Sequence, residues 1–155
     1  MKELYIMCGA PGSGKTTYVR EHASAGTSAH ISRDKIRFSM VGEGEEYFSK
    51  EQEVYKEFIK QATDALHSSW VDEVWVDATN MTKKSRMKLL GDIKFPADGV
   101  CVYVISLMPS LETCLARNYL RRGRECVPET AIRRMYENYE DPWDDGYKYE
   151  EVYEL

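Results

Sequence analysis

Eight consecutive residues near the start of the chain, from Gly9 to Thr16, match the spacing G-x-x-x-x-G-K-[ST] of loops that bind phosphate groups. Glycines at these positions let successive backbone N–H groups converge on one anion. The ammonium of Lys15 would then lie between the β- and γ-phosphates of a nucleotide, and the hydroxyl of Thr16 would ligate Mg²⁺. The expected ligands are ATP, as the default donor, and Mg²⁺. The residues expected to contact the nucleotide from this loop are Gly9, Pro11, Gly12, Ser13, Gly14, Lys15, Thr16 and Thr17.

The segments on either side of this loop support a binding role. An apolar run over residues 4–8 precedes it, and an amphipathic stretch from residue 16 to about residue 25 follows it. Strand, glycine loop and helix form the arrangement in which the start of a helix adds its dipole to the phosphate site. A glycine-rich turn without a ligand is the alternative interpretation, and the flanking strand and helix argue against it.

A second polar segment, Ser32 to Arg37, follows directly after a predicted strand. Ligands of open α/β sheets gather at the carboxyl ends of the strands, so this segment is expected to face the phosphates. Ser32 is a good N-cap, which puts Asp34 in the first helical turn, where the dipole favours an ionised carboxylate. Such a carboxylate beside a γ-phosphate would accept the proton of an attacking hydroxyl, with Arg37 on the same helix face. A capped helix with a surface ion pair is the equally weighted alternative.

Asp77 ends the third predicted strand in the same way. A carboxylate beside a phosphate loop repels the ligand unless a cation lies between them. We therefore expect Asp77 to hold Mg²⁺ next to Thr16, directly or through a water. For the neighbouring Asn80 and Thr82, capping of the next helix is the expected role. The three histidines, His22, His30 and His67, lie in no motif and receive no role.

Four arginines, at positions 117, 121, 122 and 124, surround the end of a predicted helix. Arg117 and Arg121 are four residues apart and share a helix face. Because guanidinium groups bind phosphate oxygens in a bidentate manner, a lid that closes on the transferred phosphoryl group is the expected function. Pairing with acidic residues nearby is the alternative.

The order of the predicted elements indicates an α/β fold with a parallel sheet. Strands are expected at 4–8, 29–32, 74–77 and 100–106. Helices are expected at about 15–25, 33–41, 47–69, 82–94, 109–122 and 128–140. The residues after Gly146 fit a strand or a helix equally well.

Length and charge narrow the class further. The 155 residues suggest one domain, and no apolar run approaches the roughly 20 residues that span a bilayer. Residues 137–155 hold eight acids and one base, which leaves residues 1–136 with 18 acids and 20 bases. We therefore expect a domain over residues 1–140 and an acidic tail over residues 141–155. Four cysteines without metal-ligand spacing, and a start that leads directly into a strand, favour a cytoplasmic protein.

These segments together resemble the kinase domain of phage polynucleotide 5′-kinase/3′-phosphatase and related small P-loop kinases. The matching pieces, in the same order, are Gly9–Thr16, Ser32-Arg33-Asp34…Arg37, Asp77-Ala78-Thr79-Asn80, Arg117-Asn118…Arg122-Gly123 and Val127-Pro128…Ile132…Met135…Tyr139. The resemblance implies a three-layer, adenylate-kinase-like sandwich with a parallel sheet of four to five strands, helices on both faces and an arginine-bearing lid.

The same resemblance implies an ATP-dependent kinase that acts on the 5′-hydroxyl of DNA or RNA, without the phosphatase activity of the bifunctional members. Asp34 would be the general base, and Arg37 would engage the 3′-phosphate side of the acceptor. Lys15 and Thr16 would contact the nucleotide phosphates, and Arg122 would act from the lid on the transferred group. Arg117 and Arg122 are also expected to contact the nucleotide.

Two other function classes stay open. A kinase for a small molecule (a nucleoside, sugar acid or antibiotic) would use the same core without a track for a polyanion. A non-catalytic ATP-binding module or GTPase-like switch has less support, because Asp77 is followed by Ala-Thr-Asn instead of D-x-x-G and the chain lacks N-K-x-D. The oligomeric state stays undetermined at this level.

Overall fold

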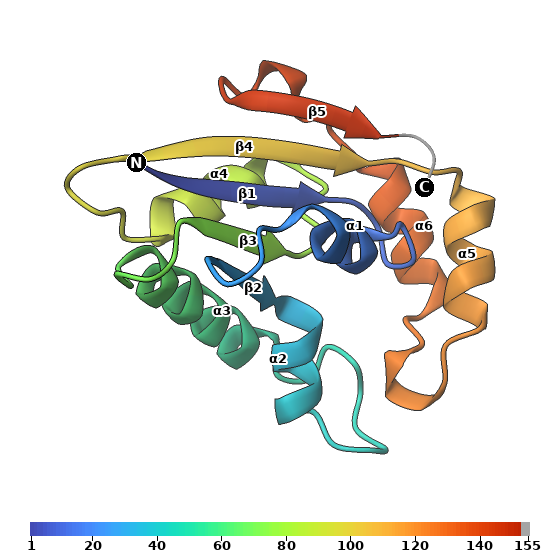
Figure 1. The fold of residues 1–155 in the computed structure, drawn as a ribbon. Coiled ribbons are helices and arrows are strands. Elements are labelled where there is room, and N and C mark those ends of the chain that lie inside the picture. Colours follow the sequence, from blue (N-terminus) through green and yellow to red (C-terminus); the bar gives the residue numbers. More distant parts are fainter. Residues whose placement is uncertain (153–155) are drawn as a thin grey trace.

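A parallel sheet of five strands forms the centre of the molecule, in a computed structural model that describes residues 1–152, the side chain of Arg124 excepted. The strand order is β2-β3-β1-β4-β5, and all four neighbouring pairs are parallel (Figure 1). The strands are β1 (Lys2–Cys8), β2 (Ser28–Ser32), β3 (Glu73–Asp77), β4 (Val100–Leu107) and β5 (Lys148–Val152). The α/β fold expected from the sequence is confirmed, and the order places β1 at the centre of the sheet.

Six α-helices connect the strands within the described residues. They are α1 (Lys15–His22), α2 (Arg33–Met40), α3 (Glu51–Leu66), α4 (Lys83–Asp92), α5 (Leu111–Tyr119) and α6 (Glu129–Glu137). Two 3-10 turns, η1 (Gly123–Glu125) and η2 (Pro142–Asp144), precede α6 and β5. None of these helices has the length and apolar character needed to cross a bilayer.

The sheet has an apolar core on each face, because the central strands carry apolar side chains on both faces of the sheet. On one face, Leu4 and Val74 pack with Phe58 of α3 and Leu89 of α4. On the other, residues of α1 pack against Trp75 and β4. A third cluster joins α5 and α6 to the loop after β1. Figure 1 shows α5 and α6 beside the carboxyl ends of the strands.

The acidic end of the chain contributes a strand to the sheet. β5 lies within the stretch expected to be a tail, and it pairs with β4 from Tyr103↔Lys148 to Leu107↔Val152. Residues 153–155 lie outside the described part. The segment before β5 is held by a fully buried ion pair, in which Nε of Arg86 lies 2.6 Å from Oδ2 of Asp145.

Side-chain caps start α2 and α4. Ser32 accepts a hydrogen bond from the Lys35 backbone N–H at the start of α2, and Thr82 accepts one from Ser85 at the start of α4. Asn80 does not cap a helix. Its amide donates to the Met7 carbonyl at 2.8 Å from a left-handed backbone conformation (φ 44°), which ties the loop after β3 to β1.

Candidate active site

The loop between β1 and α1 has the backbone that its glycines were expected to allow. Gly12 and Gly14 have φ values of 83° and 98°, in the left-handed region that favours glycine. A Cβ on Gly12 would lie 2.8 Å from the carbonyl oxygen of Cys114 on α5, so the loop and α5 are in close contact. The buried hydroxyl of Ser13 has no hydrogen-bond partner among residues 1–152.

Lys15 lies between two neighbouring cavities. One, of about 120 Å³, is also lined by Asp34, Arg37 and Asp77. The other, of about 340 Å³, is also lined by Gly12, Gly14, Thr16, Thr17, Arg117 and Arg121. The Nζ atom donates to the carbonyls of Gly9 (2.8 Å) and Ala10 (3.1 Å). We call the first the Asp34 cavity and the second the phosphate-loop cavity.

Burial lowers the pKa of Lys15, and the charges of Asp77 and Asp34 only partly oppose that effect. A phosphate placed beside the ammonium would supply the negative charge that the surroundings lack.

Asp77 is held at one oxygen by two donors. The hydroxyl of Thr16 donates to Oδ2 at 2.9 Å, and Nε2 of His30 lies 2.9 Å from the same atom. Burial alone would raise the pKa of Asp77, but the hydrogen bond from His30, the charge of Lys15 and the bond from Thr16 together hold it below its ordinary value. The carboxylate is therefore ionised, with Oδ1 left for another ligand.

A Mg²⁺ ion fits this pair of residues. Mg²⁺ prefers oxygen ligands, keeps several waters, and is usually bound through one or two side chains together with substrate phosphates. Thr16 and Asp77 offer such oxygens beside the phosphate loop. Among residues 1–152 there is no preformed group of three or more His, Cys, Asp or Glu side chains that could hold a metal, and a Mg²⁺ ion bound with ATP requires none.

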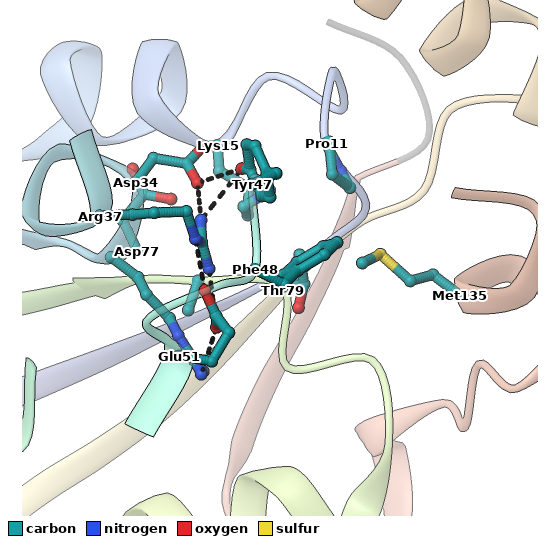
Figure 2. Close-up of a pocket in the computed structure, with 12 residues that line it drawn as sticks. Pro11, Lys15, Asp34, Arg37, Tyr47, Phe48, Glu51, Asp77, Thr79 and Met135 are labelled. Carbon is teal, nitrogen blue, oxygen red and sulfur yellow. Dashed lines mark hydrogen bonds and ion pairs between the residues drawn. The ribbon is translucent and has the colours of Figure 1, made fainter. Parts of the chain in front are cut away.

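Asp34 is part of a hydrogen-bonded network whose members come from α2, from the loop after it and from the first residue of α3 (Figure 2). Tyr47 donates its hydroxyl to Oδ1 of Asp34 at 2.7 Å, and Nη1 of Arg37 contacts the same oxygen. Arg37 in turn binds Glu51, with Nε 2.6 Å from Oε1 and Nη2 3.0 Å from Oε2. Arg33 adds a contact of 3.1 Å to Oε2 of Glu51.

Arg37 is 5% exposed, and four of its five N–H groups contact Asp34, Tyr47 or Glu51. Burial favours the neutral form, but the hydrogen bonds and charges of these partners raise the pKa of Arg37 above its ordinary value. The structure therefore places Arg37 as a support for the Asp34 carboxylate. It has little capacity left for the acceptor phosphate that the sequence resemblance assigns to it.

The arginines of α5 and of the turn after it line two different hollows. Nη1 of Arg117 donates to the Gly12 carbonyl at 3.1 Å, and Arg117 and Arg121 both line the phosphate-loop cavity. Arg122, expected to contact the nucleotide, is exposed and lines a different hollow with Tyr47 and Phe48. The structure thus brings Arg121, and not Arg122, to the phosphate loop.

Four residues of the site were missed or undervalued by sequence reasoning. Tyr47 and Glu51 reach Asp34 and Arg37 across a loop, and His30 reaches Asp77 from the next strand. No local pattern marks these three residues. For Arg121, the four-residue spacing from Arg117 was the available signal.

A parallel sheet of order 2-3-1-4-5 with a phosphate loop after the central strand defines the P-loop kinase-like class of α/β proteins. Residues 4–142 match the model of an AAA domain family, and the chain belongs to that family. Because the chain belongs to this family, the expected relation to small P-loop kinases is confirmed, and the use of ATP and Mg²⁺ is implied.

Solved structures share this fold at low sequence identity. A gluconokinase from Sinorhizobium meliloti 1021 is 17% identical with a TM-score of 0.61, and the match covers 99% of this chain and 84% of that one. The Pnkp1/Rnl/Hen1 RNA repair complex contains a chain that is 21% identical with a TM-score of 0.71, over 88% of this chain and 43% of that one. Kti12 from Chaetomium thermophilum, in complex with ADP-AlF3, is 20% identical with a TM-score of 0.62, over 97% and 88%. These likenesses concern the fold.

Proposed function

We propose that this protein transfers the γ-phosphate of ATP to a hydroxyl group, and that the first acceptor to consider is the 5′-hydroxyl of a polynucleotide end. The observation that carries the proposal is the placement of Lys15 and Asp34 on one cavity, with the phosphate loop directly beside it. A cation for the phosphates and a carboxylate for the acceptor are the two groups that phosphoryl transfer requires at its centre.

In the proposed reaction, backbone N–H groups of the loop and the ammonium of Lys15 hold the β- and γ-phosphates. Thr16 and Asp77 would hold Mg²⁺, which supplies charge neutralisation of the phosphate oxygens when bound. Asp34 accepts the proton of the acceptor hydroxyl as its oxygen bonds to the γ-phosphorus, and the bond from that phosphorus to the bridging oxygen breaks to release ADP. Arg117 and Arg121 face the phosphates and offset the charge on the transferred group.

The network behind Asp34 supports its role as the base. Tyr47 and Arg37 both contact Oδ1, which fixes the carboxylate. Its other oxygen, Oδ2, has no hydrogen-bond partner among residues 1–152 and is the one that would receive a proton. Glu51 fixes Arg37 in the same way. Such pre-organisation is how an active site keeps a reacting group within the narrow range of productive positions.

A small-molecule acceptor is the second candidate, and the hollow that contains Arg122 favours it. That hollow, of about 1050 Å³, adjoins the Asp34 cavity through Tyr47 and Phe48. Four carboxylates line it, those of Glu43, Glu45, Glu46 and Glu125, against the single cation Arg122 among its described lining residues. This acidic hollow would repel a polynucleotide strand that left the site in its direction.

Radiolabelled ATP offered with 5′-hydroxyl oligonucleotides, nucleosides, sugar acids and sugars tests the proposal. If label is transferred to an oligonucleotide, and this transfer falls steeply between low and moderate salt, the result supports the polynucleotide 5′-hydroxyl as the acceptor. Salt-insensitive transfer to a small compound supports the second. Tight ATP binding without transfer to any acceptor would favour a non-catalytic ATP-binding module and overturn the proposal.

A further inference from the structure

The loop between α5 and α6 carries Arg121 and is mostly exposed. Figure 1 shows this loop, drawn in orange, extending beyond the ends of both helices. We call residues 120–126 the arginine segment. Leu120 is 77% exposed, and among the described side chains of the segment only that of Arg121 is half-buried. Packing against the body of the molecule therefore does little to fix the position of this segment.

Asn118, the last residue but one of α5, is buried and holds both ends of the arginine segment. Its side-chain Oδ1 accepts a hydrogen bond from the Val127 N–H at 2.9 Å, and its Nδ2 donates to the Val127 carbonyl at 2.8 Å. We call these two bonds the Asn118 clamp. The backbone carbonyl of Asn118 also accepts from the Arg121 N–H at 3.0 Å. One residue thus fixes the start of the segment through its backbone and the end through its side chain.

Few other interactions tie the arginine segment to the rest of the molecule. Within residues 1–152, the Arg124 side chain excepted, the other hydrogen bonds that leave the segment also end on Asn118 or on its neighbour Arg117. Val127 is a firm anchor, because it is 1% exposed and packs in the cluster that joins α5 and α6. The clamp therefore connects an exposed segment to a buried part of the molecule.

Arg121 is the residue of this segment that reaches the phosphate-loop cavity, which Lys15 also lines. The charge of Arg121 is one of the influences that lower the pKa of Lys15, so the two cations lie close enough to interact. Like charges at this range repel each other until an anion lies between them. An exposed segment without a fixed base would relieve that repulsion by moving Arg121 into solvent.

We propose that Asn118 is a positioning residue of the active site, whose clamp on Val127 keeps the Arg121 guanidinium at the phosphate-loop cavity before ATP binds. Asn118 lines neither this cavity nor the Asp34 cavity, so its effect on a ligand passes through Arg121. Its effect on ATP affinity requires only the phosphate site, whereas its effect on turnover rests on the proposed phosphoryl transfer. Groups held in place in advance lose less free energy to ordering when the ligand arrives.

Calorimetric titration with ATP and Mg²⁺ measures the role of Asn118 without any acceptor. Asn118→Leu keeps a similar side-chain volume but removes both bonds to Val127. We expect its Kd for ATP to rise about three- to tenfold, because a charged hydrogen-bond donor is then no longer fixed at the phosphates. An unchanged Kd would overturn the proposal.

Arg121→Ala, alone and combined with Asn118→Leu, tests whether Asn118 acts through Arg121. Arg121→Ala should itself raise the Kd for ATP, and the addition of Asn118→Leu should then change Kd by less than about twofold. A merely structural role of Asn118 would instead give losses that multiply in the double variant. Multiplied losses, or an Arg121→Ala variant that binds ATP as the wild type does, would contradict the positioning role.

Tyr136→Phe is the matched control. The Tyr136 hydroxyl donates to the Pro109 carbonyl and so ties α6 to the beginning of α5, away from the arginine segment. Its loss should leave the Kd for ATP within about twofold of the wild-type value. An effect equal to that of Asn118→Leu would mean that any loosening of α5 against α6 weakens the site, and the assignment would fail. If circular dichroism shows that Asn118→Leu is unfolded, Asn118→Asp, which retains an acceptor for the Val127 N–H, replaces it in the same comparisons.

Turnover separates this inference from the proposed function. If an acceptor is phosphorylated, Asn118→Leu should lower kcat by roughly 10- to 100-fold, the order of effect of small displacements at a reacting centre, with little change in the KM for the acceptor. An unchanged kcat would then remove the positioning role. If no acceptor is phosphorylated, the proposed function fails, and the comparison of ATP affinities alone decides the role of Asn118.

Discussion

The guanidinium of Arg37 and the carboxylate of Glu51 form a two-pronged ion pair, with Nε 2.6 Å from Oε1 and Nη2 3.0 Å from Oε2. This pair leaves Nη1 directed at Asp34 and Tyr47. Glu51 is thereby linked to the proposed base through one rigid guanidinium, although it is the first residue of a different helix. Its contribution to catalysis would be positional.

Glu51→Gln is expected to lower kcat by roughly 10- to 100-fold with little change in the KM for ATP, because small displacements of a reacting group have effects of that order. Glu53→Gln, on the same helix turn but outside the cavity, is the control. Steady-state kinetics on both variants, with circular dichroism to verify folding, makes the measurement. Equal kcat values for the two variants would contradict the positioning role.

Asp34→Asn is expected to lower kcat by roughly 10²–10⁴, the usual range for a lost general base, while ATP binding measured by calorimetry persists. Lys15→Met should instead lose both ATP affinity and turnover, since its ammonium contacts the phosphates in the proposed complex. A nearly unchanged kcat in Asp34→Asn would remove the base assignment.

His30→Leu is expected to weaken Mg²⁺-dependent ATP binding several-fold, because Asp77 then keeps, among residues 1–152, only the Thr16 hydroxyl as a side-chain donor at Oδ2. His30→Gln, which retains an N–H donor at similar reach, should bind nearly as the wild type does. Calorimetric titration with ATP in the presence and absence of Mg²⁺ measures the difference. A loss of equal size without Mg²⁺ would show that His30 acts on the fold and not on Asp77.

Glu73→Gln is expected to make the free energy of unfolding fall less steeply as the pH is lowered. Burial favours the neutral form of Glu73, but hydrogen bonds from the Ser24 backbone and hydroxyl and from Trp75 lower its pKa below the ordinary value. A lowered folded-state pKa adds stability above the unfolded-state pKa of about 4.3, and this stability is lost as the pH falls through the folded-state value. Because Glu73 is partly exposed, the effect should be a few tenths of a kcal/mol. Urea unfolding at several pH values between 3 and 6 tests it, and parallel profiles for both proteins would refute it.

Arg86→Met is expected to destabilise the protein by about 3–5 kcal/mol, because it leaves the carboxylate of Asp145 buried without its partner. The double substitution Arg86→Met with Asp145→Leu should recover much of that loss. Urea unfolding of the wild type, both single variants and the double variant completes a double-mutant cycle. A cost below about 1 kcal/mol for either single substitution would mean that the pair is solvated.

The three central strands were predictable from sequence because apolar residues of each are packed in the core. The predicted runs at 4–8, 74–77 and 100–106 lie within β1, β3 and β4. The helix expected at 47–69 begins at Glu51 instead. Tyr47 and Phe48, which were expected to start the helix, lie in the loop before it. Their ring centres are 4.5 Å and 5.5 Å from the guanidinium carbon of Arg37. The spacing of apolar residues along the sequence predicted the helix, but it gives no information on such a cation–π contact.

The candidate site was predictable where a local pattern carries it. The loop residues and Asp34 come shortly after strands, Asp77 is the last residue of one, and parallel strands bring those ends together. Arg37, Glu51 and Tyr47 depend on how a loop folds over α2, and His30 depends on strand register. Both are long-range features that a single sequence leaves undefined.

The acidic residues on β5 have a consequence for how the protein behaves at high concentration. This strand forms one edge of the sheet, and Lys148, Glu150 and Glu151 place charges along it. A strand edge offers unpaired backbone groups to other chains, and charged side chains along it disfavour that pairing. The charges along β5 thus disfavour the addition of neighbouring copies to this edge of the sheet, and Glu150→Val with Glu151→Thr is expected to make the protein more prone to edge-to-edge aggregation.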